Sequence, residues 1–187
     1  IDNSGKVSEY ILTCRQMGID ILPPDINEGE ARFSVSDGAI RFALCAIKSI
    51  GRPVVESIIE ERKLGGRFKS LTDFIERMGG KDVNNRVVES RIKAGALDSL
   101  GGNRQQFMIA YAGIMDGVAQ SQKTMMTGQL SLFDLVGEEE KESFQAKLPD
   151  VDEYPKELML SFEKEVLGVY VSGHPLEEYM DRWKKNI

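Results

Sequence analysis

The sequence predicts a mainly α protein with one small β-hairpin and a flexible acidic arm. Apolar residues recur at helical spacing along most of the chain, as in amphipathic helices that face a core. A single Asp-Gly pair interrupts a stretch of alternating apolar residues, which is typical of a hairpin turn. Acidic charge gathers after residue 120, where the helical pattern weakens. These three observations define the fold class.

Each element follows from a local pattern. Gly18 is suited to end the first helix as its C-cap, and Pro53 is suited to the first turn of the second. The alternation on both sides of Asp37-Gly38 predicts a hairpin over residues 32–43. Residues 19–27 contain Pro23-Pro24 and are predicted to be an extended loop. We expect helices over residues 7–17, 53–62, 71–78, 86–94, 104–119, 158–168 and 176–185, and a weakly ordered linker over 121–155.

Composition narrows the class of protein. The chain has 187 residues, 41% of them hydrophobic, which is enough for one or two small cores. The chain contains no apolar run of the ~20 residues that cross a bilayer, and its polar start, Ile1-Asp2-Asn3-Ser4, is neither a signal peptide nor an initiating Met. We therefore expect a piece of a longer, cytoplasmic protein. Cys14 and Cys45 are interpreted as small buried hydrophobes. One histidine and two scattered cysteines are too few for the usual four ligands of a zinc site.

The net charge of −6 is unevenly distributed. Residues 1–120 carry 16 basic and 16 acidic side chains, whereas residues 121–187 carry 8 basic and 14 acidic ones. Within residues 41–104 there are 13 basic and 8 acidic side chains. A mildly basic module followed by an acidic arm is compatible with contact to nucleic acid by the first part only.

One short frame occurs twice, about fifty residues apart. Ala46-Ile47-Lys48-Ser49-Ile50-Gly51 recurs as Ala96-Leu97-Asp98-Ser99-Leu100-Gly101, and each copy precedes a predicted helix. The frame resembles the helix-hairpin-helix motif, a sequence-nonspecific DNA-binding unit. A tight turn at a helix N-terminus directs unpaired backbone N–H groups and the positive end of the helix dipole outward, and both favour a phosphate. The sequence thus predicts a tandem helix-hairpin-helix domain.

The candidate phosphate contacts lie in the turns of the two copies. They are Lys48, Ser49, Gly51 and Arg52 in the first copy, and Ser99, Gly101, Gly102, Asn103 and Arg104 in the second. Ser49 and Pro53 stand where the motif often has glycine, and Pro53 removes one N–H donor. Asp98 places a negative charge in the second turn. Either copy is equally compatible with a purely structural helix–turn–helix corner.

A pentapeptide in the predicted linker is a second candidate site. Gln129-Leu130-Ser131-Leu132-Phe133 resembles the peptide that bacterial proteins insert into a groove of the sliding clamp. In that mode Leu132 and Phe133 fill an apolar pocket, the Gln129 amide fixes the register and Leu130 adds contact area. The alternative is a short amphipathic turn that packs back on the parent domain.

Several longer runs carry a family resemblance. They are residues 17–27, 40–51, 68–74, 85–89, 92–101, 128–133 and 163–176. In this order they resemble the bacterial DNA polymerase III alpha subunit, the C-family replicative DNA polymerases. The resemblance implies the end of a fingers domain with the β-hairpin (1–45), a tandem helix-hairpin-helix domain (46–120), a linker with the clamp-binding peptide (121–157) and a helical segment leading to an OB-fold (158–187).

The resemblance also implies which parts of the polymerase lie outside this chain. DNA-directed DNA polymerase chemistry needs palm carboxylates that hold Mg²⁺, and in this family they lie upstream of the residues present here. We therefore expect no catalytic residue, metal or cofactor in this segment. Asp150 and Asp152 have the spacing of a metal-binding pair, but they are better explained as a solvated acidic run, and His174 as a turn residue.

Two hypotheses about function remain open from the sequence. In the first, the segment binds the sliding clamp and grips duplex DNA through phosphates, as one part of a polymerase III holoenzyme with other subunits and no membrane contact. In the second, it is a structural connector between the fingers and C-terminal domains without any DNA contact.

Overall fold

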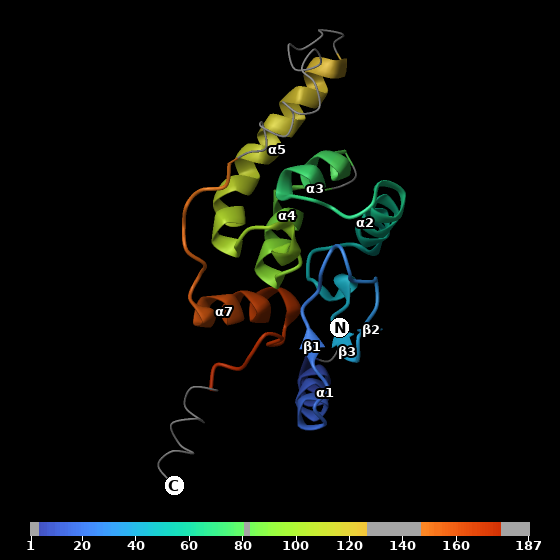
Figure 1. Ribbon diagram of the computed structural model, residues 1–187, viewed down its shortest axis with the longest axis vertical. Coiled ribbons are helices and arrows are strands. Elements are labelled where there is room, and N and C mark those ends of the chain that lie inside the picture. The colour runs from blue at the N-terminus through green and yellow to red at the C-terminus, as the bar shows by residue number, and fades with distance from the viewer. Residues whose placement is uncertain (1–3, 81–82, 127–146, 177–187) are drawn as a thin grey trace.

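The computed structural model describes residues 4–80, 83–126 and 147–176, and within them the fold is mainly helical, as predicted (Figure 1). The six α-helices in this part of the chain agree with the predicted order. They are α1 (Ser4–Gln16), α2 (Arg52–Gly65), α3 (Leu71–Met78), α4 (Asn85–Ala94), α5 (Arg104–Met126) and α7 (Lys156–Leu167), with short 3-10 helices η1 (Leu44–Ala46) and η2 (Asp98–Leu100). The helix predicted over 176–185 lies almost wholly outside the described residues.

A small sheet joins α1 to the helical region. The predicted hairpin is confirmed as β2 (Ser34–Ser36) and β3 (Ala39–Arg41), which pair antiparallel around Asp37-Gly38. Both turn residues have positive φ, 51° and 81°, as a two-residue hairpin turn with the twist of the strands requires. The loop prediction for residues 19–27 is wrong in part, because β1 (Ile21–Leu22) pairs in parallel with β3.

Local capping explains where the helices begin and end. The Ser70 side chain accepts a hydrogen bond from the Asp73 N–H at the start of α3, and the Asn84 side chain accepts one from the Val87 N–H at the start of α4. At the end of α4, Gly95 is left-handed and its N–H donates to the Arg91 and Ile92 carbonyls. These caps fix the ends of the helices on either side of the turns.

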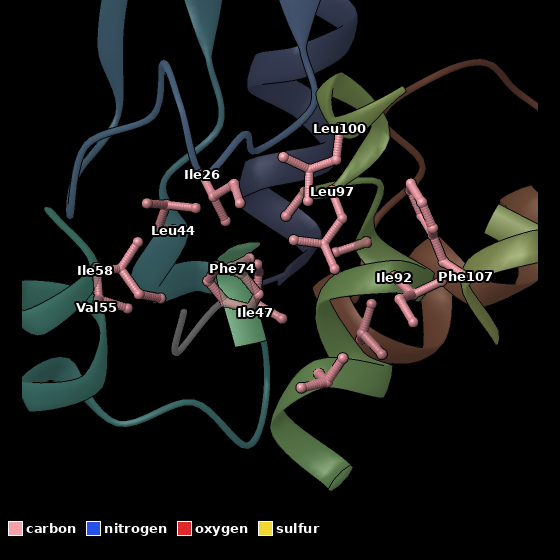
Figure 2. Close-up of a cluster of buried hydrophobic side chains, with 14 of the residues drawn as sticks. Ile26, Leu44, Ile47, Val55, Ile58, Phe74, Ile92, Leu97, Leu100 and Phe107 are labelled. Carbon is pink, nitrogen blue, oxygen red and sulfur yellow. The ribbon is translucent and has the colours of Figure 1, made fainter. Parts of the chain in front are cut away.

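A single hydrophobic cluster connects the two hairpin frames, and Figure 2 shows its central side chains. Ile47 in the first frame and Leu97 and Leu100 in the second are all buried in this cluster. Phe74 of α3 and Phe107 of α5 are fully buried among them. The aliphatic positions that the two frames share therefore serve core packing in both copies.

The linker prediction needs correction at both of its described ends. Helix α5 continues to Met126, beyond the predicted end near Ala119. Residues 147–155 are extended but make defined contacts, since Leu148 packs against the core and the Val151 carbonyl accepts a hydrogen bond from Asn103. The prediction underestimated order because the stabilising contacts of this segment come from residues distant in sequence. The four predicted domain boundaries stay predictions.

The C-terminal part of the described chain packs against the helical region. Helix α7 lies against α4, and residues 147–155 run beside α5 to reach it (Figure 1). The carboxylate of the fully buried Glu163 accepts hydrogen bonds from the Val171 and Ser172 N–H groups, so that it holds the chain after α7 in place. The guanidinium of Arg15 donates to the Val171 carbonyl, which links α1 to the same segment. None of the described helices is long and apolar enough to cross a membrane.

Candidate nucleic-acid interface

The second frame forms a complete helix–turn–helix unit. Helix α4 ends at Gly95, the chain passes through η2, and α5 begins at Arg104. Gly101 is left-handed with φ 80°, a conformation that favours glycine. Ala96 and Leu97 are fully buried under the turn, which leaves Ser99 and Gly101 on the surface.

The first frame is preceded by a different type of helix from the second. The short η1 precedes it in place of an α-helix, and α2 follows it. Ser49 adopts a positive φ of 67°, and Gly51 is the N-cap of α2 without a side-chain cap. Only the second copy therefore has α-helices on both sides of its turn.

The N-terminus of α5, predicted as a phosphate site, is capped by the chain itself. The Asn103 side chain accepts from the Gln106 N–H at 2.8 Å, and the Gln106 side chain accepts from the Asn103 N–H at 3.0 Å. This reciprocal pair is a capping box. The Glu153 carboxylate accepts from the N–H groups of Arg104 at 2.8 Å and Gln105 at 3.3 Å. These amides are thus already bonded to a negative group.

Arg104 was predicted to contact phosphate, but its side chain lies inside the protein. It is 4% exposed, and its guanidinium donates to the Asp98 carboxylate at 2.9 Å. The buried Glu163 carboxylate lies 3.6 Å from the same guanidinium. Burial would lower the pKa of Arg104, but the neighbouring carboxylates outweigh it and raise the pKa above its ordinary value. Arg104 is therefore a paired structural charge and is not placed to reach DNA.

Gly102 and Ser99 also serve internal contacts. A Cβ atom at Gly102 would lie 2.6 Å from the Phe107 ring and 2.7 Å from Leu148, so the missing side chain makes room for packing within the protein. The Ser99 hydroxyl donates to the Asp25 carboxylate at 3.2 Å and accepts from the Asn27 amide. Of the candidates in the second copy, only Gly101 is exposed without such a role in the described structure.

The first copy leaves its helix N-terminus open. The N–H groups of Gly51 and Arg52 have no hydrogen-bond partner among residues 4–80, 83–126 and 147–176. The Arg52 side chain is 63% exposed and pairs with Glu56 within α2. Ser49 is exposed at the tip of the turn. Backbone donors at the positive end of a 14-residue helix, next to exposed basic charge, suit an anion.

Lys48, unlike the other candidate residues of the first copy, is bonded to another part of the protein. Its N–H donates to the Val166 carbonyl at 2.8 Å, and its Nζ donates to the Glu165 carbonyl at 2.9 Å. Both acceptors lie in the last turn of α7, where carbonyls lack partners within the helix and a cation is favourable. Lys48 therefore caps α7 and anchors the first turn to it.

The remaining candidates fall outside these two turns. The pentapeptide residues Gln129, Leu130, Leu132 and Phe133 lie outside the described residues. His174 lies in a turn, where its Nδ1 accepts from the Leu176 N–H. Asp150 and Asp152 lie in the extended segment before α7, and the part of the chain that the structure describes holds no group of three side chains able to bind a metal.

Sequence reasoning missed Glu153, the residue that occupies the α5 N-terminus. Its bond to the Arg104 amide spans 49 positions of sequence, so no local pattern could have revealed it. The capping box was visible, since Asn103 is followed by Gln106 at the required spacing.

The second frame, with α4 and α5 on either side of its turn, has the arrangement of a helix-hairpin-helix motif, and one family comparison matches this part of the chain. Residues 18–107 match the family model described as "Helix-hairpin-helix motif". This match covers both copies of the repeated frame and the start of α5.

The particular relatives share one name. The chain is 40% identical to the DNA polymerase III subunit alpha of Vibrio cholerae over 99% of its length, and 37% identical to that of Escherichia coli K12 over 100% of its length. It is 40% identical to that of Thermus aquaticus over 95% of its length. It spans only 14–16% of the length of these relatives. The resemblance predicted from the sequence is confirmed: the chain is homologous to one segment of DNA polymerase III alpha subunits.

Proposed function

We propose that this chain is the DNA-contacting and clamp-binding segment of a bacterial replicative DNA polymerase. The observation that carries the proposal is the similarity to DNA polymerase III alpha subunits over 94–100% of the chain. The DNA-directed polymerase activity belongs to the longer protein, and its Mg²⁺ to palm residues outside this chain. The segment itself needs no cofactor. It works in the cytoplasm as part of a holoenzyme with other subunits.

The DNA contact is proposed to be with phosphates and independent of sequence. The open N-terminus of α2, with the Gly51 and Arg52 N–H groups and the Arg52 side chain, supports it. Phosphate contacts position a duplex without reading its bases. Such a grip weakens with salt, because each phosphate contact releases condensed counterions. Fluorescence anisotropy with a short blunt duplex at low and at high salt tests this contact.

The clamp contact is proposed for the pentapeptide Gln129–Phe133. It lies between the last residue of α5, Met126, and the extended segment that begins at Lys147. A peptide on the same chain as a DNA contact makes rebinding of the clamp intramolecular, at millimolar effective concentration for short linkers. Tethering to a ring on DNA would supply processivity.

Replacing the two apolar anchors tests the clamp contact. Each of Leu132 and Phe133 is expected to contribute roughly 1.5–3 kcal/mol when buried in a pocket. The pair Leu132→Ala and Phe133→Ala should therefore weaken binding to the cognate clamp by about 100-fold or more. Isothermal titration calorimetry measures the loss, and Leu135→Ala, two residues beyond the peptide, is the matched control. Equal affinity of the double variant and the wild type would refute the assignment.

A structural connector is the second candidate, and specific contacts favour it. Lys48 caps α7, and Arg104 is buried against Asp98, so both frames are used for internal packing. If the segment is only a connector, it binds no duplex DNA even at low salt. The anisotropy titration therefore separates the two functions.

A further inference from the structure

The segment over residues 147–155 places the Glu153 carboxylate at the N-terminus of α5, in the second hairpin. Both oxygens of the Glu153 carboxylate are used: Oε2 accepts from the Arg104 N–H, and Oε1 accepts from the N–H groups of Gln105 and Tyr154. A carboxylate at a helix N-terminus satisfies the same unpaired donors that a phosphate satisfies in an anion site.

The rest of the segment fixes this carboxylate in place. The Asn103 amide donates to the Val151 carbonyl at 2.9 Å, and the Gln106 amide donates to the Pro149 carbonyl at 2.8 Å. Leu148 packs at Gly102, where a Cβ atom would collide with its side chain. The segment therefore covers the turn from the end of η2 to the first turn of α5.

The charge of the segment opposes DNA at this turn. Asp150 and Asp152 are exposed on either side of Val151, and Glu153 follows them. The guanidinium of Arg104, the first residue of α5, is already paired with Asp98 and Glu163. A phosphate approaching the α5 N-terminus would meet acidic side chains in place of free donors. The first hairpin has no such cover among the described residues.

We propose that residues 147–155 are an internal occupant of the second hairpin and that Glu153 takes the place of a phosphate there. The inference rests on the proposed DNA contact and assigns it to one site: DNA binds at the α2 N-terminus, while the second hairpin is closed by its own chain. Because the occupant is tethered, it competes at high effective concentration. The second hairpin opens to phosphate only when the segment leaves it.

Amide chemical shifts of the ¹⁵N-labelled full chain test this assignment. On titration with a short blunt duplex, the amides of Ser49, Gly51 and Arg52 should shift, and those of Arg104 and Gln105 should not. In Glu153→Gln the carboxylate becomes an amide, whose NH₂ group cannot accept from the second backbone N–H. In this variant the amides of Arg104 and Gln105 should also shift with DNA.

Affinity gives a second readout with a matched control. Glu153→Gln should bind the duplex about tenfold tighter at low salt, because the Arg104 and Gln105 amides then no longer face a carboxylate and can bond a phosphate. Asp152→Asn removes the same charge one residue away without a bond to α5, and its duplex affinity should stay within about twofold of the wild type. Melting curves of both variants verify that they are folded, and Glu153→Ala repeats the test if the Gln variant is not.

The outcomes separate this inference from the proposed function. If DNA shifts the Arg104 and Gln105 amides of the wild type, or if Glu153→Gln gains neither shifts nor affinity, the internal occupant is refuted while the DNA contact stands. If the wild type binds no DNA but Glu153→Gln gains binding at α5, the internal occupant stands and the DNA contact of the wild type fails. If neither protein binds DNA, both proposals fail.

Discussion

The two hairpins share a sequence frame but use their helix N-termini in opposite ways. In the second, the donors of α5 are bonded to Asn103, Gln106 and Glu153. In the first, the N-cap of α2 is Gly51, without a side-chain cap, and its N–H has no hydrogen-bond partner among the described residues. A repeated frame has thus produced one closed turn and one open turn.

The difference shows what the frame encodes. Its aliphatic positions, such as Ile47 and Leu97, are buried in the same hydrophobic cluster in both copies. Its turn positions depend on neighbours outside the frame. The second copy has two more residues between the last glycine of the frame and its helix, which brings Asn103 to the N-cap, and it meets a segment that returns from 49 positions away. The frame therefore predicts packing, and binding depends on what reaches the turn.

The largest effect is expected from breaking the buried charge pair of the second hairpin. Arg104→Met keeps the length of the side chain but leaves Glu163, which is 0% exposed, without its cation. Removing one partner of a buried pair costs about 3–5 kcal/mol. The free energy of unfolding from urea titration measures this loss.

The first hairpin supplies the control for this variant. Arg52→Met changes an exposed side chain whose one ion pair within the described residues is with Glu56. Its effect on the free energy of unfolding should stay within about 0.5 kcal/mol. If the two variants lose similar stability, the contrast between a closed and an open turn is wrong.

The helix that leads into the second hairpin offers a change in the opposite direction. Arg91 is 1% exposed, its Nε and Nη2 have no hydrogen-bond partner among the described residues, and burial lowers its pKa to about 9. Within the described part of the chain no carboxylate pairs with this buried charge, unlike that of Arg104. Arg91→Met should raise the free energy of unfolding by about 1–4 kcal/mol.

The pH dependence of the difference in free energy of unfolding between the wild type and Arg91→Met shows whether the buried charge causes it. Below pH 9 Arg91 is protonated in the folded and unfolded states, so the full cost of the buried charge is present. Above pH 9 the folded protein releases this proton before the unfolded chain does, so the stability of the wild type rises relative to Arg91→Met. The difference in free energy of unfolding between Arg91→Met and the wild type should therefore become smaller between pH 8 and pH 10.5. A constant difference would attribute the stabilisation to packing alone.

A methyl group added at one glycine of each turn distinguishes the two turns by their packing. Gly102→Ala places a Cβ atom 2.6 Å from the buried Phe107 ring and should destabilise the fold by about 1–3 kcal/mol. Gly51→Ala places one 3.6 Å from Pro53, with no other described atom beyond its chain neighbours within 4 Å. We expect a smaller loss there, of about 0.5–1 kcal/mol, because Ala is a poor N-cap. Thermal unfolding of both variants under one buffer condition makes the comparison.

Features that depend on residues close together in the sequence were predicted, and features that depend on residues far apart in the sequence were missed. The hairpin at Asp37-Gly38 and the bounds of α3 are local patterns, and both were predicted. The strand β1 was missed because two residues form a strand only by pairing with β3. Arg104 was predicted as a DNA contact, since a basic residue at a helix N-terminus is locally typical of one. Its burial depends on Glu163, which no local pattern brings to it.

The smallest change in stability is expected where the open turn is given its own acid. Gly51→Asp places a carboxylate at the N-cap of α2, where it can share the Val54 N–H, which donates to the Gly51 carbonyl at 3.1 Å, since Pro53 has no N–H. A favourable cap should add a few tenths of a kcal/mol, to at most about 1 kcal/mol, to the free energy of unfolding. The same carboxylate should repel phosphate and reduce duplex affinity, so that the first hairpin comes to resemble the second. Gly51→Ser caps the helix without charge and should retain most of the affinity. If Gly51→Asp binds DNA as tightly as the wild type in anisotropy titrations at low salt, phosphate does not bind at the α2 N-terminus.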